Sequence, residues 1–130
     1  MSQIEPGLQC DATLVVAEEH TAEHLKSGKL LVYSTPLMVA LMEEAALKAV
    51  APRLEPGQDT VGITLDIQHL APTPVGMKVT AKAELVEVDR RRLVFNVEAF
   101  DEQEKIGQGS HQRMIIDVDR FLARVQEKAG

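Results

Sequence analysis

The stretch Pro36–Val50, PLMVALMEEAALKAV, constrains the fold more than any other part of the chain. It is rich in Ala, Leu and Met, which are strong helix formers. Glu44 and Lys48 form an i,i+4 pair that marks its one polar face. A helix that is apolar over so much of its circumference needs cover on most sides, so we expect it to be buried in the middle of the fold.

The ends of this helix are also marked in the sequence. Pro36 suits the first helical position, and either Ser34 or Thr35 suits the cap before it. Pro52 cannot continue a helix and predicts its end.

Segments with a two-residue alternation surround the helix. Short turns separate the last four of them, which favours antiparallel pairing between consecutive strands, as in a meander. Asp119–Ala129 predicts a short C-terminal helix, and Arg90–Arg92 a hairpin connection. One apolar helix against one curved antiparallel sheet is an α+β architecture. The expected strands are Ala12–Ala17, Val61–His69, Met77–Asp89, Leu93–Asp101 and Ile106–Val118.

The chain of 130 residues suits one domain, residues 1–130, with no repeat or linker that would divide it. Only 3% of the residues are aromatic, so the core must be built from aliphatic side chains and Met. Cys10 is the single cysteine, which excludes an internal disulfide and fits a reducing compartment. Without a signal peptide or a membrane-length apolar run, we expect a cytoplasmic protein. The net charge of −6 argues against a nucleic-acid binder.

Three polar residues stand where catalytic chemistry is feasible. Thr35 precedes the apolar helix, Glu43 lies about two turns along it on the flank of the apolar face, and His69 ends the next strand. A threonine hydroxyl can attack or orient a thioester carbonyl when a carboxylate or a histidine acts as base. A histidine near neutral pKa can move the proton.

Structural explanations compete with each of these roles. Thr35 is a good helix cap, Glu43 can reach solvent, and His69 can be a hydrogen-bonded structural residue. The same applies to His111 on the last strand. If the helix start binds an oxyanion, Leu37 and Met38 must supply the amides, because Pro36 has none.

Two other clusters have weaker functional interpretations. His20 and His24 have an i,i+4 spacing that can bind a metal, but no third ligand motif accompanies them, so we predict no metal site. The arginines Arg90–Arg92 form the only dense basic cluster and are typical of a solvated turn. Together with Lys78 and Lys82, they are also the candidates for contacting the phosphates of a ligand.

Four stretches together resemble the fluoroacetyl-CoA thioesterase-like group of the hot-dog superfamily. They are STPLMVALMEEA, the run from LEPGQ to VGITLDIQHLAPTPVG, AELVEVDRRRLVFNVEAFDE, and IGQGSHQRMIIDVDRF. Their order and spacing carry the resemblance over about Leu30 to Phe121. It implies a hot-dog fold, in which a curved antiparallel sheet wraps around a long central helix.

The resemblance also implies a function. It assigns Thr35, Glu43 and His69 as the catalytic residues of an acyl-CoA thioesterase, and Gly62 and Arg113 to the acyl pocket. Tyr33 and Arg91 complete the expected substrate-binding residues. The group forms its site at a dimer interface, so we expect a homodimer, or a tetramer of two dimers. No cofactor is implied, because coenzyme A is part of the substrate.

Several questions stay open at this point. The acyl group can pass through a covalent intermediate on Thr35, through an anhydride on Glu43, or directly to an activated water. The fluoroacetyl-specific enzyme has phenylalanines in a lid before its catalytic threonine, whereas HLKSGKLLVYST has only Tyr33, so we expect another small acyl-CoA as substrate. The alternatives are a non-catalytic acyl-CoA-binding module and a hot-dog hydratase or dehydratase.

Overall fold

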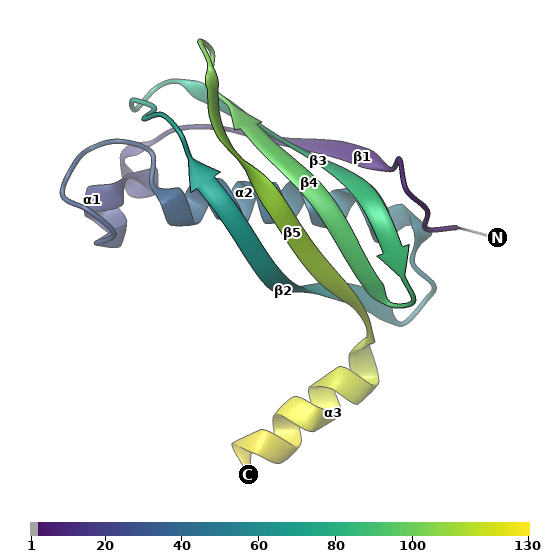
Figure 1. The fold of residues 1–130 in the computed structure, drawn as a ribbon. Coiled ribbons are helices and arrows are strands. Elements are labelled where there is room, and N and C mark those ends of the chain that lie inside the picture. The colour runs from purple at the N-terminus through teal and green to yellow at the C-terminus, as the bar shows by residue number, and fades with distance from the viewer. Residues whose placement is uncertain (1–2) are drawn as a thin grey trace.

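The computed structural model describes residues 3–130, which form one five-stranded antiparallel sheet, a long helix on one face of it and a helix at the C-terminus (Figure 1). The helices are α1 (Ala22–Leu25), α2 (Thr35–Val50) and α3 (Val118–Ala129), with single 3-10 turns at Glu18–His20 and Ala51–Arg53. The strands are β1 (Gln9–Val15), β2 (Gln58–His69), β3 (Lys78–Asp89), β4 (Arg92–Phe100) and β5 (Lys105–Asp117).

The strand order is β1-β3-β4-β5-β2, and every neighbouring pair is antiparallel. The predicted meander is therefore correct for β3, β4 and β5 but wrong for β2, which pairs with β5 instead of β3. The physical reason is that β1 occupies the other edge of β3, so the chain crosses the end of the sheet between β2 and β3. As a result, β2 is an edge strand.

Helix α2 packs on the concave side of the sheet, chiefly against β1 and β3 (Figure 1). Its buried side chains recur at helical spacing and form one apolar stripe. Val39, which lies beside that stripe, is only half-buried. The remaining face of α2 is solvent-exposed in the single chain, so the helix is central to the fold without being covered all round. The stripe is Met38, Leu41, Met42, Ala45, Ala46, Ala49 and Val50.

A β-bulge interrupts the register of β2 between Gly62 and Thr64. Gly62 pairs with Arg113 before the bulge, and Leu65 pairs with His111 after it. Successive strand residues alternate between faces, so residues 62 and 69 would face opposite sides of an unbroken strand. The extra residue at Ile63 restores them to the same face, the one that α2 covers.

Helix α3 leaves the end of β5 and projects away from the rest of the molecule (Figure 1). None of its residues is buried, and Phe121, Leu122 and Val125 form an exposed apolar stripe. Among the helices of residues 3–130, none has the length and hydrophobicity needed to cross a lipid bilayer.

Candidate active site

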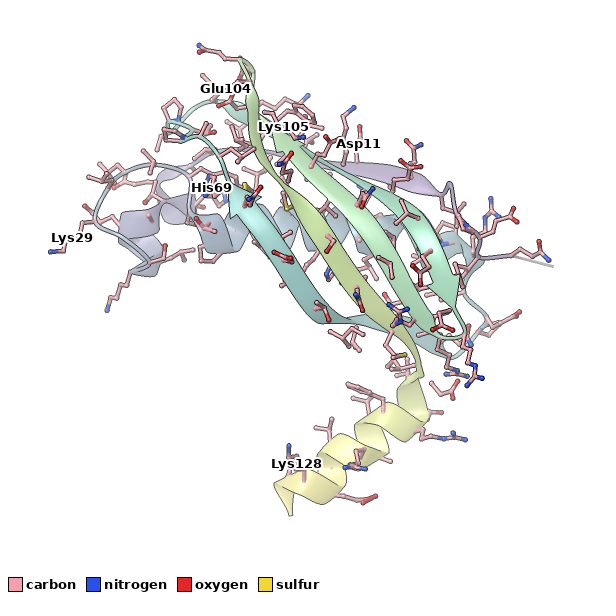
Figure 2. All side chains as sticks on the ribbon, viewed as in Figure 1. Asp11, Lys29, His69, Glu104, Lys105 and Lys128 are labelled. Carbon is pink, nitrogen blue, oxygen red and sulfur yellow. The ribbon has the colours of Figure 1, made fainter. Side chains whose placement is uncertain are left out.

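The side chains of Thr35 and His69 form a hydrogen-bonded pair at the start of α2. Thr35 Oγ1 lies 2.6 Å from His69 Nδ1. His69 is the last residue of β2, and Figure 2 shows it at the end of that strand. We refer to Thr35 and His69 as the hydroxyl–imidazole pair.

Backbone hydrogen bonds hold the two segments of this pair together. The segment after β2 meets the segment before α2 where the Tyr33 N–H donates to the Thr73 carbonyl at 2.9 Å. The Leu70 N–H donates to the Ile106 carbonyl at 2.7 Å, which fixes the residue next to His69 against β5. Because the anchors are backbone groups, the pair has a defined geometry without a special side-chain support.

His69 sits in an environment that favours its neutral form. Burial lowers the pKa of His69, and the backbone of Ala71 partly opposes this effect. Its Nε2 is buried and makes no hydrogen bond within the part of the chain that the structure describes. A neutral imidazole can accept a proton from the Thr35 hydroxyl, which is the requirement for a general base.

Hydrogen bonds at the start of α2 show which of the two candidate residues caps the helix. Ser34 is the helix cap, and its hydroxyl accepts from the Leu37 N–H at 3.3 Å. The Met38 N–H donates to the Ser34 carbonyl at 3.0 Å. Thr35 and Pro36 are then the first two helical residues. The Leu37 and Met38 amides, which an oxyanion site at the helix start would need, therefore both have partners within the chain.

A second group of polar residues lies further along α2, where Glu43 meets β2 and β5. The carboxylate Oε2 of Glu43 is 3.8 Å from Arg113 Nη1. It also lies 2.9 Å from the position that a Cβ would take on Gly62, so only glycine leaves room for the carboxylate here. We refer to Glu43, Gly62 and Arg113 as the carboxylate cluster.

Arg113 is 6% exposed and is held mainly by neutral acceptors. Its Nε donates to Thr60 Oγ1 at 2.8 Å and its Nη2 to the Thr60 carbonyl at 3.0 Å. Its Nη1 lies 3.1 Å from His111 Nε2. Burial lowers the pKa of Arg113, whereas the carboxylates of Glu43 and Asp59 raise it. A guanidinium ion keeps its charge through such a shift, so a fixed positive charge faces Glu43.

The two groups are separate within one chain. Glu43 lies eight residues after Thr35 on the same helix, a rise of about 12 Å. Gly62 and His69 are seven residues apart on β2, which spans about 23 Å. The structure thus brings Thr35 to His69 and Glu43 to Gly62 and Arg113, but it does not bring all five together in a single chain.

The other predicted substrate-binding residues lie elsewhere. Tyr33 is buried, and its hydroxyl donates to the Leu37 carbonyl at 3.0 Å, so it packs under the start of α2. Burial, with a smaller contribution from Glu44, raises the pKa of this hydroxyl. Arg91 lies in the β3–β4 hairpin and forms an ion pair of 3.4 Å with Asp117.

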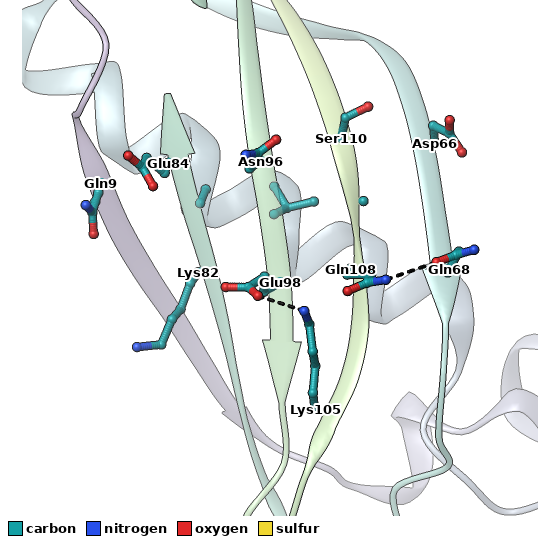
Figure 3. Close-up of a pocket in the computed structure, with 13 residues that line it drawn as sticks. Gln9, Asp66, Gln68, Lys82, Glu84, Asn96, Glu98, Lys105, Gln108 and Ser110 are labelled. Carbon is teal, nitrogen blue, oxygen red and sulfur yellow. Dashed lines mark hydrogen bonds and ion pairs between the residues drawn. The ribbon is translucent and has the colours of Figure 1, made fainter. Parts of the chain in front are cut away.

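A polar groove of about 610 Å³ lies on the face of the sheet opposite α2 (Figure 3). None of the predicted catalytic residues lines it. An ion pair between Lys105 and Glu98 and a hydrogen bond between Gln108 and Gln68 cross it. The lining also includes Asp66, Lys82 and Glu84, and because none of the candidate catalytic residues is among them, the candidate site stays on the α2 face.

The sequence did not predict that Thr60 and His111 contact Arg113 of the carboxylate cluster. For His111 the sequence predicts a hydrogen-bonded structural role as the alternative to an acid–base role, but no contact with Arg113. The usable signal was its two-residue spacing from Arg113, which places both side chains on one face of β5. Thr60 has no such signal, because its link to Arg113 depends on the pairing of β2 with β5.

Comparison with known proteins gives consistent relatives. The profile of the fluoroacetyl-CoA-specific thioesterase family matches residues 16–119. The fluoroacetyl-CoA thioesterase of Streptantibioticus cattleyicolor is 44% identical over 97 residues, which are 75% of this chain and 70% of that protein. The 1,4-dihydroxy-2-naphthoyl-CoA hydrolase of Listeria monocytogenes is 34% identical over 68 residues, covering 52% of this chain and 54% of that protein.

Solved structures agree over nearly the whole chain. A fluoroacetyl-CoA thioesterase structure superimposes with a TM-score of 0.91 at 37% identity, covering 97% of this chain and 98% of the other. A thioesterase superfamily member from Thermus thermophilus gives a TM-score of 0.89 at 31% identity, covering 98% and 97%. The curved sheet and its central helix are thus the hot-dog fold.

Proposed function

The chain belongs to the fluoroacetyl-CoA-specific thioesterase family and is a thioester hydrolase, and we propose that Thr35, Glu43 and His69 are its catalytic residues on a small acyl-CoA. The observation that carries the proposal is the 2.6 Å contact between Thr35 Oγ1 and His69 Nδ1. A hydroxyl in contact with a neutral imidazole is the arrangement that makes a weak nucleophile reactive.

The hydroxyl–imidazole pair supports a covalent route. Thr35 Oγ1 attacks the thioester carbonyl carbon while His69 takes its proton. The carbon–sulfur bond breaks, and His69 returns the proton to the departing coenzyme A thiolate. A water molecule then attacks the Thr35 ester with His69 again as base, which releases the free acid and restores the hydroxyl. The imidazole is positively charged only while it holds the proton in each step, and a nearby carboxylate would stabilise that transient charge.

Glu43 is the group suited to that electrostatic role, but it needs a second copy of the chain to reach the pair. Edge strand β2 has unpaired backbone groups along one side, which can pair with an identical strand. A two-fold axis makes such pairing antiparallel. Antiparallel pairing centred between Leu65 and Asp66 sets Gly62 of the partner subunit opposite His69, about 5 Å away. We therefore propose a homodimer with two equal sites.

Exposed apolar side chains are consistent with this interface. Ile63 and Leu65 on β2 are 47% and 46% exposed, although a core-facing strand usually buries such residues. The apolar stripe of α3 starts from the same end of the sheet as β2 and has no cover in the single chain. We propose that both pack against the second copy. Pairing of dimers into tetramers stays a prediction.

The substrate is proposed to be a short acyl-CoA other than fluoroacetyl-CoA. Tyr33, the only aromatic residue before Thr35, is buried and hydrogen-bonded to the helix, so it is not free to act as an aromatic lid. Arg91 is proposed to contact the coenzyme A phosphates from the partner subunit, because the antiparallel dimer brings that end of the sheet toward His69. Coenzyme A and the single Cys10 fit a cytoplasmic location.

A thiol-release assay over a panel of acyl-CoA substrates tests the proposal. The panel contains acetyl-, propionyl-, butyryl-, benzoyl- and fluoroacetyl-CoA. We expect steady release of free coenzyme A from at least one non-fluorinated member, and its loss by at least about 100-fold in Thr35→Ala and in His69→Ala. Binding without thiol release, in wild type and variants alike, would instead identify an acyl-CoA-binding module.

A further inference from the structure

His111 occupies a place in the hydrogen-bond network that fixes its tautomer. The ring is fully buried on β5, and its Nδ1 lies 2.9 Å from the Thr64 carbonyl. A carbonyl only accepts, so Nδ1 must carry the hydrogen. Its Nε2 lies 3.1 Å from Arg113 Nη1, which only donates, so Nε2 must be the acceptor. Both contacts require the same neutral imidazole.

This tautomer makes His111 one of the acceptors that orient the Arg113 guanidinium. Thr60 holds Nε and Nη2, whereas His111 holds Nη1, the nitrogen nearest to Glu43. The 3.8 Å between Nη1 and the Glu43 carboxylate is longer than a hydrogen bond. The neutral acceptors, rather than the carboxylate, therefore define where the guanidinium lies.

The bulge in β2 creates the geometry for this arrangement. It directs the Thr64 carbonyl toward His111 Nδ1, while Gly62 leaves space for the ring on its other side, where a Cβ would lie 3.2 Å from His111 Cε1. Phe95 on β4 stacks against the ring at a centroid distance of 6.2 Å. Polar contacts on two sides and an aromatic ring on a third hold the imidazole in its observed orientation.

We propose that His111 is a positioning residue for thioester hydrolysis, because its neutral ring holds Arg113 against Glu43. This inference rests on the proposed function. The charged groups that face His111 and Arg113 are Glu43 from α2 and Asp59 from β2. If His111 gained a second proton, Nε2 would become a donor facing a donor, and Arg113 would have to move away from its place beside the carboxylate.

Two substitutions separate positioning from simple core packing. His111→Leu keeps an apolar side chain of moderate size but removes the acceptor, and His111→Gln can still accept from Arg113 and donate to Thr64. We expect His111→Leu to lower kcat by about tenfold or more, the equivalent of one lost hydrogen bond to a charged donor, with a smaller effect on KM. His111→Gln should recover most of that loss.

A matched control is Phe95→Leu, which disturbs packing around the ring without removing a polar contact. If Phe95→Leu and His111→Leu unfold at similar urea concentrations, only His111→Leu should lose kcat. Equal kcat losses in the two variants, or no recovery in His111→Gln, would overturn the positioning role.

A spectroscopic measurement decides the inference even if no substrate is found. Long-range nitrogen–proton correlation spectra of the wild-type imidazoles distinguish the two neutral tautomers and the imidazolium ion. We expect the His111 signals at pH 7 to show a proton on Nδ1 and a bare Nε2. A proton on Nε2 would contradict the inference, whether or not the protein hydrolyses acyl-CoA.

Discussion

Gly62 contributes to the candidate site through the absence of a side chain. A Cβ at this position would lie 2.9 Å from Glu43 Oε2 and 3.6 Å from Arg113 Nη1. The backbone of Gly62 lies outside the left-handed region, so an alanine fits the strand itself. The conflict is therefore with the carboxylate, which has to swing away.

Gly62→Ala should lower kcat/KM by about tenfold or more while the free energy of unfolding changes by less than about 1 kcal/mol. Steady-state kinetics with the best acyl-CoA of the panel and urea unfolding give the two values. Val15→Ala, which is exposed on strand β1 at the opposite edge of the sheet, serves as the control and should retain activity. Full activity of Gly62→Ala would show that the carboxylate does not need its observed position.

The environment of His69 predicts the pH range of activity. A general base must be unprotonated, and burial lowers the pKa of His69 below the ordinary value of 6.5. The acidic limb of kcat/KM against pH should therefore fall below pH 6.5. Thr35→Ser preserves the hydroxyl and should show the same limb. A limb at or above pH 6.5 in wild type would mean that a different group limits the reaction.

Buried His111 predicts a loss of stability in mild acid. Burial is the main cause of its lowered pKa, so below pH 6.5 the unfolded chain binds a proton that the folded chain excludes. Stability from this group is complete above pH 6.5 and is lost as the pH falls toward the lowered value, by about 1.4 kcal/mol for each unit of separation. Urea unfolding of wild type and His111→Gln between pH 5 and 8 should show a steeper acid loss in wild type. Parallel curves would contradict it.

At the scale of elements, strand β2 contributes residues to both parts of the candidate site. Its bulge at Ile63 lets Gly62 and His69 share the face toward α2 despite their odd spacing. No other strand carries residues of both the hydroxyl–imidazole pair and the carboxylate cluster. The bulge thus places residues of both groups on one face of the sheet.

Deletion of Ile63 should abolish activity with the sheet still formed. Without the extra residue, either Gly62 or His69 must turn to the opposite face, because strand residues alternate. Ile63→Ala keeps the bulge and is the matched control. We expect the deletion variant to lose at least about 100-fold in kcat/KM and to keep the circular dichroism of wild type. An active deletion variant would show that the shared face is unimportant.

Elements with a strong local pattern could be predicted from the sequence, and their pairing could not. The apolar stripe and the flanking prolines defined α2 to within one residue, and the alternation gave β3, β4 and β5 within one residue at each end. The place of β2 depends on a long-range competition with β1 for the edge of β3, which no local pattern records. The bulge could not be predicted for the same reason, because it is defined only by the pairing of β2 with β5.

The candidate site likewise has one part that could be predicted from the sequence and one part that could not. Thr35 and His69 were predicted to act together, and the structure brings them together. Glu43 was predicted to join them, and the rise of α2 keeps it apart within one chain. Thr60 contacts Arg113 only through the pairing of β2 with β5, so its place beside the carboxylate cluster could not be predicted without the register of the sheet.

At the scale of the whole molecule, a homodimer accounts for the separation of the hydroxyl–imidazole pair from the carboxylate cluster. Each chain would contribute Thr35 and His69 to one site and Glu43, Gly62 and Arg113 to the other. This explains why an edge strand with exposed Ile63 and Leu65 lies between the two groups. A monomer would have to move α2 against the sheet to bring Glu43 to Thr35, which would disrupt the packed core.

Mixing two inactive variants tests this arrangement directly. In a heterodimer of Glu43→Gln and His69→Ala chains, one site receives both defects and the other receives neither. Random exchange of subunits makes half of the dimers heterodimers, so activity should return to about a quarter of the wild-type value. The measurement is thiol release after the variants are unfolded together in urea and refolded.

The control mixture is Thr35→Ala with His69→Ala, whose defects fall in the same half of a site. Every dimer in that mixture has at least one defect at each site, so it should stay inactive under the same refolding. Recovery in the first mixture and not in the second requires that catalytic residues come from two chains. If both mixtures stay inactive although size-exclusion chromatography shows dimers, Glu43 must act within its own chain, and α2 or β2 must then move during the reaction.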